Sequence, residues 1–152
     1  MSDPTVLFFD VETNPVKNFT TLEGLEVIHC LSVYDPKRKS VVTFDGAGIP
    51  EGLEMLNKAG MIIGHNVIGF DVPALKKTYE WKPKAKIIDT LVMARCIFPD
   101  VRATDMQGKT PKELWGSHSL KAWGGRIGMA KGLYGEEEEA FEEYYEQMRE
   151  YC

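Results

Sequence analysis

Two carboxylates, Asp10 and Glu12, follow directly on a run of mainly apolar residues from Thr5 to Phe9. Residues two apart on a strand leave the same face, so these side chains would lie about 7 Å apart along it. At a separation of ~5 Å and an effective dielectric near 20, two such charges repel by roughly 3 kcal/mol. A divalent cation such as Mg²⁺ removes that cost, because it prefers oxygen ligands. The alternative is that the pair begins a polar turn, helped by Asn14 and Pro15, and the DxE spacing leaves both interpretations open.

A third acidic residue, Asp71, ends the loop of residues 65–71 (HNVIGFD) and precedes a predicted helix with Pro73 in its first turn. Loops that follow the strands of an α/β sheet gather at one edge, where ligands bind. Asp71 would then face the same crevice as the end of the first strand. Asn66 could hold this loop through side-chain hydrogen bonds, and Phe70 offers a stacking surface. Asp is also a favoured helix N-cap residue, and this motif alone favours the cap.

A fourth candidate, Tyr151, lies on a predicted acidic, amphipathic helix at the end of the chain, residues 136–152. The helix carries an apolar stripe at spacings of three and four, which makes a core tyrosine the default interpretation. The stripe consists of Phe141, Tyr144, Tyr145 and Met148. A carboxylate four residues after Tyr151 would share its helix face and could bind a metal beside the phenol oxygen. That position lies beyond Cys152.

Hydrophobic periodicity predicts the elements that would hold these residues. The predicted strands are 5–11, 26–35, 39–45, 61–64 and 85–89, and the predicted helices are 50–59, 72–81, 90–98, 117–129 and 136–152. The first strand reads as a central strand buried on both faces, and the next two read as an antiparallel hairpin with a basic turn.

The order of these elements predicts one α/β domain over residues 1–152, with a mixed β-sheet flanked by helices. Residues 99–116 are polar and broken by Gly and Pro, which predicts a long surface loop. We expect Ser117 to cap the helix that follows, and Asp89 to be a helix cap rather than a metal ligand.

Composition limits the function classes. With 152 residues and 43% hydrophobic content, the chain is too short to hold a polymerase module as well as this domain. The net charge of −5 argues against broad wrapping of duplex nucleic acid, although contacts through metals, aromatic rings and isolated lysines stay possible. Three cysteines without a CxxC pair predict a reduced, intracellular protein, and three scattered histidines make a poor zinc site. The sequence predicts no signal peptide and no membrane span.

Taken in order, the motifs resemble a known family. DxE on a first strand, an N-x-x-x-F-D loop entering a helix, and a late helix with a tyrosine are similar to the three exonuclease motifs of the DnaQ-like 3′–5′ exonucleases, which have a ribonuclease H-like fold. Longer stretches resemble the proofreading domain of family A DNA polymerases from podovirus-type bacteriophages. These stretches are GHNVIGFDVPALKK, IDTLVMAR, GSHSLKAWGGRIGMAKGLY and YEQMREYC. The likeness covers nearly the whole chain, and SHSLKAWG is its most family-specific part.

The resemblance implies a two-metal site that takes Mg²⁺ or Mn²⁺. Asp10 and Glu12 match the first motif, Asp71 the second, and Tyr151 the tyrosine of the third; no histidine follows His118, which implies the tyrosine subclass. Asp10 would bridge both ions, Glu12 would hold the ion that carries the attacking water, and Asp71 would support the second ion. Tyr151 would orient the water. Substrate contacts would come from Asn66, Phe70 and Thr13.

The implied function is removal of 5′-nucleotides from single-stranded DNA 3′ ends, beside a polymerase domain in the same or another chain, in the host-cell cytoplasm. The family's fourth acidic ligand lies four residues after the tyrosine, three positions beyond Cys152. We therefore expect either a fragment of a longer chain or a domain that has lost a ligand, with weakened metal binding and poor catalysis. Two alternatives stay open: a catalytically impaired, exonuclease-like binding or structural module, and an RNA-trimming 3′–5′ exoribonuclease.

Overall fold

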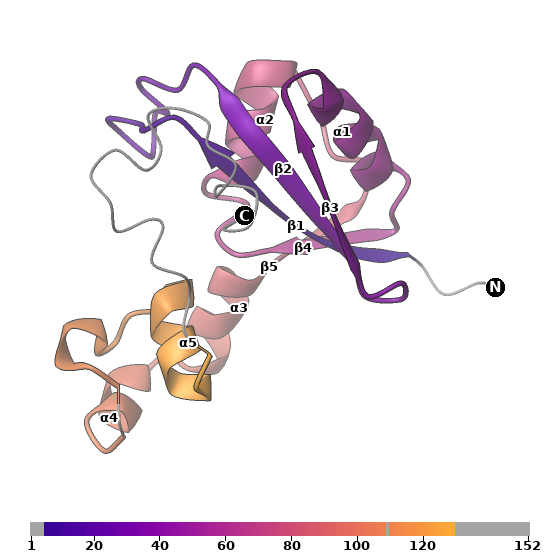
Figure 1. Cartoon of the computed structure of the whole chain (residues 1–152). Coiled ribbons are helices and arrows are strands. Elements are labelled where there is room, and N and C mark those ends of the chain that lie inside the picture. The colour runs from indigo at the N-terminus through magenta and orange to yellow at the C-terminus, as the bar shows by residue number, and fades with distance from the viewer. Residues whose placement is uncertain (1–4, 109, 130–152) are drawn as a thin grey trace. The chain divides into compact units, whose positions relative to one another are not determined.

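The structure is a computed structural model that describes residues 5–108 and 110–129 (Figure 1). The chain divides into two compact units: Met1–Asp89 together with Tyr134–Cys152, and Thr90–Leu133. We call them unit 1 and unit 2. The predicted helix 136–152 lies outside the described residues, and the single domain over residues 1–152 stays a prediction. Within the described ranges, no helix is long and apolar enough to cross a membrane.

Unit 1 is built on a five-stranded mixed sheet with the order β3-β2-β1-β4-β5. The strands are β1 Val6–Thr13, β2 Ile28–Asp35, β3 Ser40–Asp45, β4 Met61–Gly64 and β5 Lys86–Asp89. β2 pairs antiparallel with both β1 and β3, whereas β1–β4 and β4–β5 are parallel pairs, so β2 alone among the five runs against the others. This is the strand arrangement of the ribonuclease H-like fold, and the predicted fold class and β2–β3 hairpin are confirmed.

Two helices, α1 Ile49–Asn57 and α2 Asp71–Tyr79, supply the apolar cover of unit 1 and follow the 3₁₀ turn η1 Gly46–Gly48 and strand β4 respectively. Their buried leucines join one hydrophobic core with Phe9 and Val11 of β1. α1 approaches the sheet closely at Gly52, where an added Cβ would lie 2.6 Å from the ring of Phe44. Larger residues are therefore excluded at that point of contact.

The prediction that β1 is buried on both faces is wrong. Phe9 and Val11 are each 4% exposed, but Phe8, on the opposite face, is 39% exposed. The apolar run reflects a central strand whose core face packs on the helices, while its other face carries Phe8, Asp10 and Glu12. The face that carries the two carboxylates is thus the more accessible one.

Unit 2 contains α3 Thr90–Ile97, α4 Val101–Asp105, the 3₁₀ turn η2 Lys112–Leu114 and α5 Leu120–Ile127. The long surface loop predicted over 99–116 is therefore wrong, since it contains both α4 and η2. The cap prediction is also wrong, by two residues: Ser119 is the N-cap of α5, and its hydroxyl accepts the N–H of Ala122 at 3.2 Å. Ser117 instead accepts the N–H of Ser119 at 3.2 Å.

A buried ion pair explains why this polar stretch folds. Asp105 is 2% exposed, and its two oxygens accept from Nε and Nη2 of Arg126, each at 2.8 Å. The N–H of Gly116 donates to the same carboxylate at 2.8 Å, and Arg126 also donates to the carbonyl of Ser117 at 2.7 Å. Arg126 holds the pKa of Asp105 well below its usual range, chiefly through this side-chain hydrogen bonding. One pair thus joins α4, the segment before α5, and α5 itself.

We expect Asp105→Asn to lower the stability of unit 2 by about 3–5 kcal/mol, because the change leaves the buried Arg126 guanidinium without its charged partner. Since the folded pKa of Asp105 is depressed, its contribution is present above the unfolded value near ~3.9 and is lost as pH falls below it. The difference from the parent protein should therefore shrink at low pH. Hydrogen exchange of unit 2 amides in denaturant, at several pH values, measures it.

The matched control is the exposed pair Arg38–Asp35, 3.6 Å apart, in which the Arg38 side chain is 81% exposed. Arg38→Gln should cost no more than roughly 0.5 kcal/mol. Equal losses in the two variants would show that burial does not set the strength of the Asp105–Arg126 pair.

Candidate functional site

Asp71 is the first residue of α2, and its side chain reaches β1 instead of capping the helix. The N-cap position is Phe70, which makes no side-chain cap hydrogen bond. Asp71 is 3% exposed, and its Oδ1 accepts the N–H of Val11 at 3.1 Å, across 60 residues of sequence. The N-cap interpretation of Asp71 is therefore wrong. Val11 stands between Asp10 and Glu12, so this bond delivers a third carboxylate to the DxE motif.

Asp71 also meets the carboxyl group of Asp10. Burial raises the pKa of Asp71 well above its ordinary value, and the charge of Asp10 and a hydrogen bond with its side chain raise it further. The N–H of Val11 acts in the opposite direction but does not outweigh them. A buried carboxyl group beside a second one is costly when both are ionised, and such arrangements are concentrated at functional sites.

Glu12 lies on the same face of β1 as Asp10, and both are partly exposed. The register of β1 against β2 shifts between Glu12 and Thr13, a bulge-like irregularity that changes the direction of side chains at the end of the strand. The structure thus brings Asp10 and Asp71 together, with Glu12 two residues along. Among the described residues, no group of three or more His, Cys, Asp or Glu side chains forms a ready metal cage. Tyr151 lies outside the described residues.

The donors at this site suit a hard divalent cation. Asp10 and Asp71 present carboxylate oxygens, which Mg²⁺ and Mn²⁺ prefer over nitrogen or sulfur ligands. Partial exposure of Asp10 and Glu12 leaves room for the waters that Mg²⁺ usually retains. A cation would also remove the mutual repulsion that raises the pKa of Asp71. The residues present therefore fit such an ion.

The loop before Asp71 is held by Asp89 at the end of β5. The Asp89 carboxylate accepts the N–H of Asn66 and the N–H of Ile68, each at 3.0 Å. Asn66 has a positive φ of 63°, and an added Cβ on Gly69 would lie 2.5 Å from its Oδ1, so the loop is tightly wound. Sequence reasoning treated Asp89 as a helix cap and missed this role, because the pairing spans more than 20 residues.

A cavity of about 290 Å³ opens beside Glu12. Its lining residues are Glu12, Thr13, Asn14, Pro15, Val16, Phe19 and Phe70. The rings of Phe19 and Phe70 lie 5.5 Å apart, and Phe19 is 66% exposed. Two of the predicted substrate residues, Thr13 and Phe70, thus lie on one cavity, whereas Asn66 does not line it. Phe19 and Val16 were missed, because no periodic pattern marks the segment between β1 and β2.

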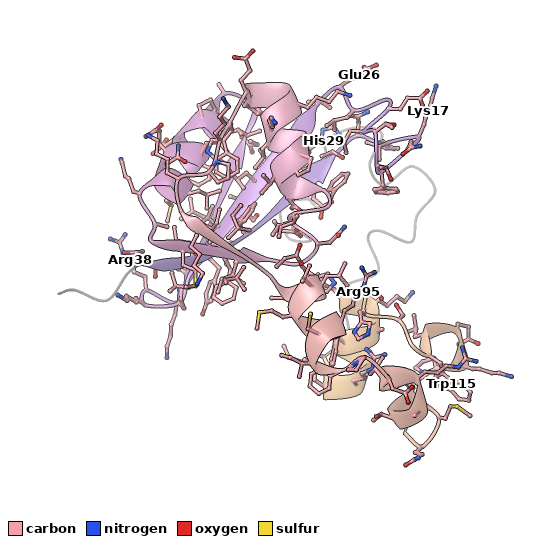
Figure 2. The ribbon with its side chains drawn as sticks, turned by 180° about the vertical axis from the view of Figure 1, so that it is seen from behind. Lys17, Glu26, His29, Arg38, Arg95 and Trp115 are labelled. Carbon is pink, nitrogen blue, oxygen red and sulfur yellow. The ribbon has the colours of Figure 1, made fainter. Side chains whose placement is uncertain are left out.

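That segment, residues 14–27, is fixed by Asn14. Its Nδ2 donates to the carbonyl of Gly24 at 2.7 Å, and its Oδ1 accepts the N–H groups of Glu26 and Val27, each at 3.0 Å. Lys77 of α2 donates to the carbonyl of Leu22 at 2.6 Å. Figure 2 shows Lys17 and Glu26 at the outer end of this segment. The cavity wall is therefore pinned from both the strand and the helix.

Two phage proteins match the sequence over most of its length. The chain is 34% identical over 159 aligned residues to the "DNA-directed DNA polymerase" of Escherichia phage T7, covering 91% of the chain and 22% of that protein. For the enzyme of the same name from Enterobacteria phage T3, identity is 34% over 163 residues, covering 94% of the chain and 22% of the polymerase. The predicted resemblance to phage DNA polymerases is confirmed. The chain spans about a fifth of the length of these relatives, and no family model matches it.

Two solved structures share the general arrangement. The family B DNA polymerase from Pyrobaculum calidifontis gives a TM-score of 0.48 at 16% identity, covering 64% of this chain and 17% of that one. Trypanosoma brucei RNase D gives a TM-score of 0.45 at 16% identity, covering 70% and 34%. Scores of this size decide neither fold nor function, and the fold assignment rests on the strand order of the sheet itself.

We expect Asp89→Asn to loosen the loop before Asp71. An asparagine side chain keeps one acceptor oxygen but presents N–H groups to the other amide, so the protein should lose about 1–3 kcal/mol of stability. The hydrogen exchange of the Asn66 and Ile68 amides should become faster. Asp35→Asn is the matched control, because Asp35 accepts the N–H groups of Lys37 and Arg38 in the β2–β3 turn. If hydrogen exchange of the Asn66 and Ile68 amides is equally fast in the control, Asp89 does not hold this loop.

Asp71→Asn should have the opposite effect when no divalent metal is present. The amide keeps an acceptor for Val11 but carries no charge, which relieves a repulsion of up to roughly 3 kcal/mol at ~5 Å. Because the folded pKa of Asp71 is raised, its stabilising effect is complete below ~3.9 and is lost as pH rises through the raised value. Thermal unfolding in a chelator from pH 4 to 8 should show a higher, flatter melting curve for the variant. A less stable variant at pH 7 would contradict the assigned repulsion.

Proposed function

We propose that this chain is a metal-dependent 3′–5′ exonuclease domain that removes 5′-nucleotides from single-stranded DNA 3′ ends. The observation that carries the proposal is the buried Asp71 carboxyl group held against Asp10 on β1. Homology to phage DNA polymerases supports DNA as the substrate and editing beside a polymerase domain, in the same or another chain, as the setting. We place this activity in the host-cell cytoplasm, which suits free thiols at Cys30 and Cys96.

In this proposal Asp10, Glu12 and Asp71 hold Mg²⁺ or Mn²⁺. When bound, the ions supply an activated water and charge stabilisation at the leaving 3′ oxygen. Asp71 is held in place by the N–H of Val11 at 3.1 Å, so its carboxylate does not have to be ordered when a cation binds. Asp10, which interacts with Asp71, would supply a second carboxylate ligand. Glu12, which lines the cavity, would supply a third.

The cavity beside Glu12 is proposed to receive the terminal base. Its walls are largely apolar, and the exposed ring of Phe19 beside Phe70 offers a π-face that suits any base. Stacking of this kind is sequence-tolerant, as an editing enzyme requires. Thr13 and Asn66 are proposed as further substrate contacts, and Tyr151 as the residue that orients the water, since a free phenol titrates near ~10 and is a weak base at neutral pH.

A second candidate function keeps this fold as a binding module without efficient hydrolysis. It is favoured by the observation that, in the part of the chain the structure describes, fewer than three potential ligands converge. A nuclease that trims RNA is the third candidate, because no described contact distinguishes the two sugars. Metal affinity and product analysis separate the three.

We expect Asp10→Ala to abolish both the thermal stabilisation by Mn²⁺ and the hydrolysis of a 5′-labelled single-stranded DNA oligonucleotide. Removal of an activating metal site typically costs several orders of magnitude in rate, because ions and carboxylates act as one unit. Melting temperatures with and without Mn²⁺, together with gel analysis of the shortened products, measure the two effects. An RNA oligonucleotide of the same sequence tests the sugar preference.

Glu51→Ala, which removes an exposed carboxylate from the first turn of α1, is the matched control and should leave both properties unchanged. If the parent chain binds Mn²⁺ through Asp10 but releases no nucleotide, the binding-module candidate is correct. If Asp10→Ala alters neither the stabilisation by Mn²⁺ nor the hydrolysis, the DNA exonuclease and the RNA-trimming nuclease are both wrong.

A further inference from the structure

Unit 2 has a charge opposite in sign to that of the whole chain. Residues 90–133 contain seven lysines and arginines against three acidic residues, whereas the full sequence has 18 basic and 23 acidic residues. An acidic protein has therefore concentrated positive charge in one compact unit. Local excess of Lys and Arg is the usual electrostatic signature of contact with a phosphate backbone.

Three basic side chains in the described part of unit 2 lie at its surface. Arg95 on α3, Arg102 on α4 and Lys112 on η2 are all exposed, and Figure 2 labels Arg95. In contrast, Arg126 is committed to the buried pair with Asp105, and its side chain is 10% exposed. Among residues 90–108 and 110–129, the ion pair of Arg126 with Asp105 does not involve Arg95, Arg102 or Lys112, so these three side chains make the positive surface.

Unit 2 also contains an aromatic cavity of about 340 Å³. Phe98 and Trp123 lie on its wall with ring centroids 5.3 Å apart, and Phe98 is 48% exposed. The guanidinium carbon of Arg126 stands 4.7 Å from the centre of the Trp123 ring, which fixes the indole from one side. A rigid indole beside an exposed phenyl ring forms a platform for a flat aromatic ligand.

Two N–H groups of this cavity's lining residues have no acceptor in the described structure. They are Nε1 of Trp123 and Nη1 of Arg126, and both are buried. A buried donor without a partner costs about 1–3 kcal/mol. A ligand that brings oxygen or ring-nitrogen acceptors would recover part of that cost, and nucleobases carry such atoms at their edges.

We propose that unit 2 carries a binding site for single-stranded nucleic acid, built from residues other than the carboxylate site. One base stacks on Phe98 and Trp123, and neighbouring phosphates contact Arg95, Arg102 and Lys112. A single strand fits better than a duplex, because only unpaired bases expose a face for stacking. The site needs no metal, so it is independent of the proposed nuclease function.

The test is the affinity of the complete chain for a fluorescein-labelled oligothymidylate, measured by anisotropy in a chelator so that no hydrolysis occurs. Phe98→Ala should weaken binding roughly tenfold, because stacking of one base is worth about 1–3 kcal/mol. Ile127→Ala is the matched control: Ile127 is 65% exposed on α5 and does not line the cavity. Circular dichroism checks that both variants keep their helices.

The phosphate contacts have their own measurement. The double variant Arg102→Gln with Lys112→Gln should reduce the slope of log affinity against log salt by about 0.7 for each lost contact. Lys82→Gln with Lys84→Gln, both exposed in unit 1, makes the same change in charge and should leave that slope unchanged. Oligouridylate should bind as tightly as oligothymidylate, since neither stacking nor phosphate contacts read the sugar.

Equal binding by the parent chain and by Phe98→Ala would overturn the proposal, as would equal loss with the unit 1 lysine variant. Preference for a duplex of the same length would overturn it too. Glu51→Ala, which removes an exposed carboxylate outside both sites, should bind the oligonucleotide like the parent. The parent chain could bind the oligonucleotide in chelator through Phe98 and yet release no nucleotide when Mn²⁺ is supplied. That result would disprove the nuclease function and support the unit 2 site.

Discussion

The hydrogen bond from the Val11 N–H to the carboxylate of Asp71 is the interaction on which the candidate site depends. It joins the first turn of α2 to the central strand, and it holds a buried carboxyl group at the backbone of Val11, the residue between Asp10 and Glu12. Without this bond, the Asp71 carboxyl group would not be held against the backbone of β1. With it, a carboxyl group 60 residues away becomes part of the motif on β1.

The buried acidic residues of this chain differ in what neutralises them. Asp105 meets a guanidinium, and Asp89 accepts two backbone N–H groups of a loop. The Arg126 guanidinium lowers the pKa of Asp105 and so stabilises its ionised form. Asp71 has the N–H groups of Val11 and of its own backbone and a second carboxyl group as neighbours, and burial and Asp10 together raise its pKa, so the hydrogen bonds do not compensate its charge. Stability alone does not account for such a residue, whereas the cation proposed for this site would.

The sequence predicted the strands and the fold class well, because hydrophobic runs and their spacing are local properties. It predicted Asp10, Glu12 and Asp71 as one site by resemblance, and the structure shows how Asp71 reaches β1. Two of the failures, the loop over 99–116 and the N-cap interpretation of Asp71, come from contacts between distant residues. Residues 99–116 read as a loop because Arg126, which pairs with Asp105, lies 21 positions further along. Tyr151 lies outside the described residues, and its role stays a prediction.

Net charge is a poor guide to the partners of a protein with two units. A total of −5 describes a chain in which residues 90–133 carry four positive charges in excess, so the remainder is far more acidic than the sum implies. An anionic strand approaching Asp10 and Glu12 is repelled unless cations intervene, and the screening length of about 8 Å at physiological salt confines that repulsion to the site itself. Exposed basic side chains such as Arg102 and Lys112, in the same unit as the cavity of Phe98 and Trp123, would attract such a strand in the binding mode proposed for unit 2. The distribution of charge, rather than its total, therefore decides whether this acidic chain can hold nucleic acid.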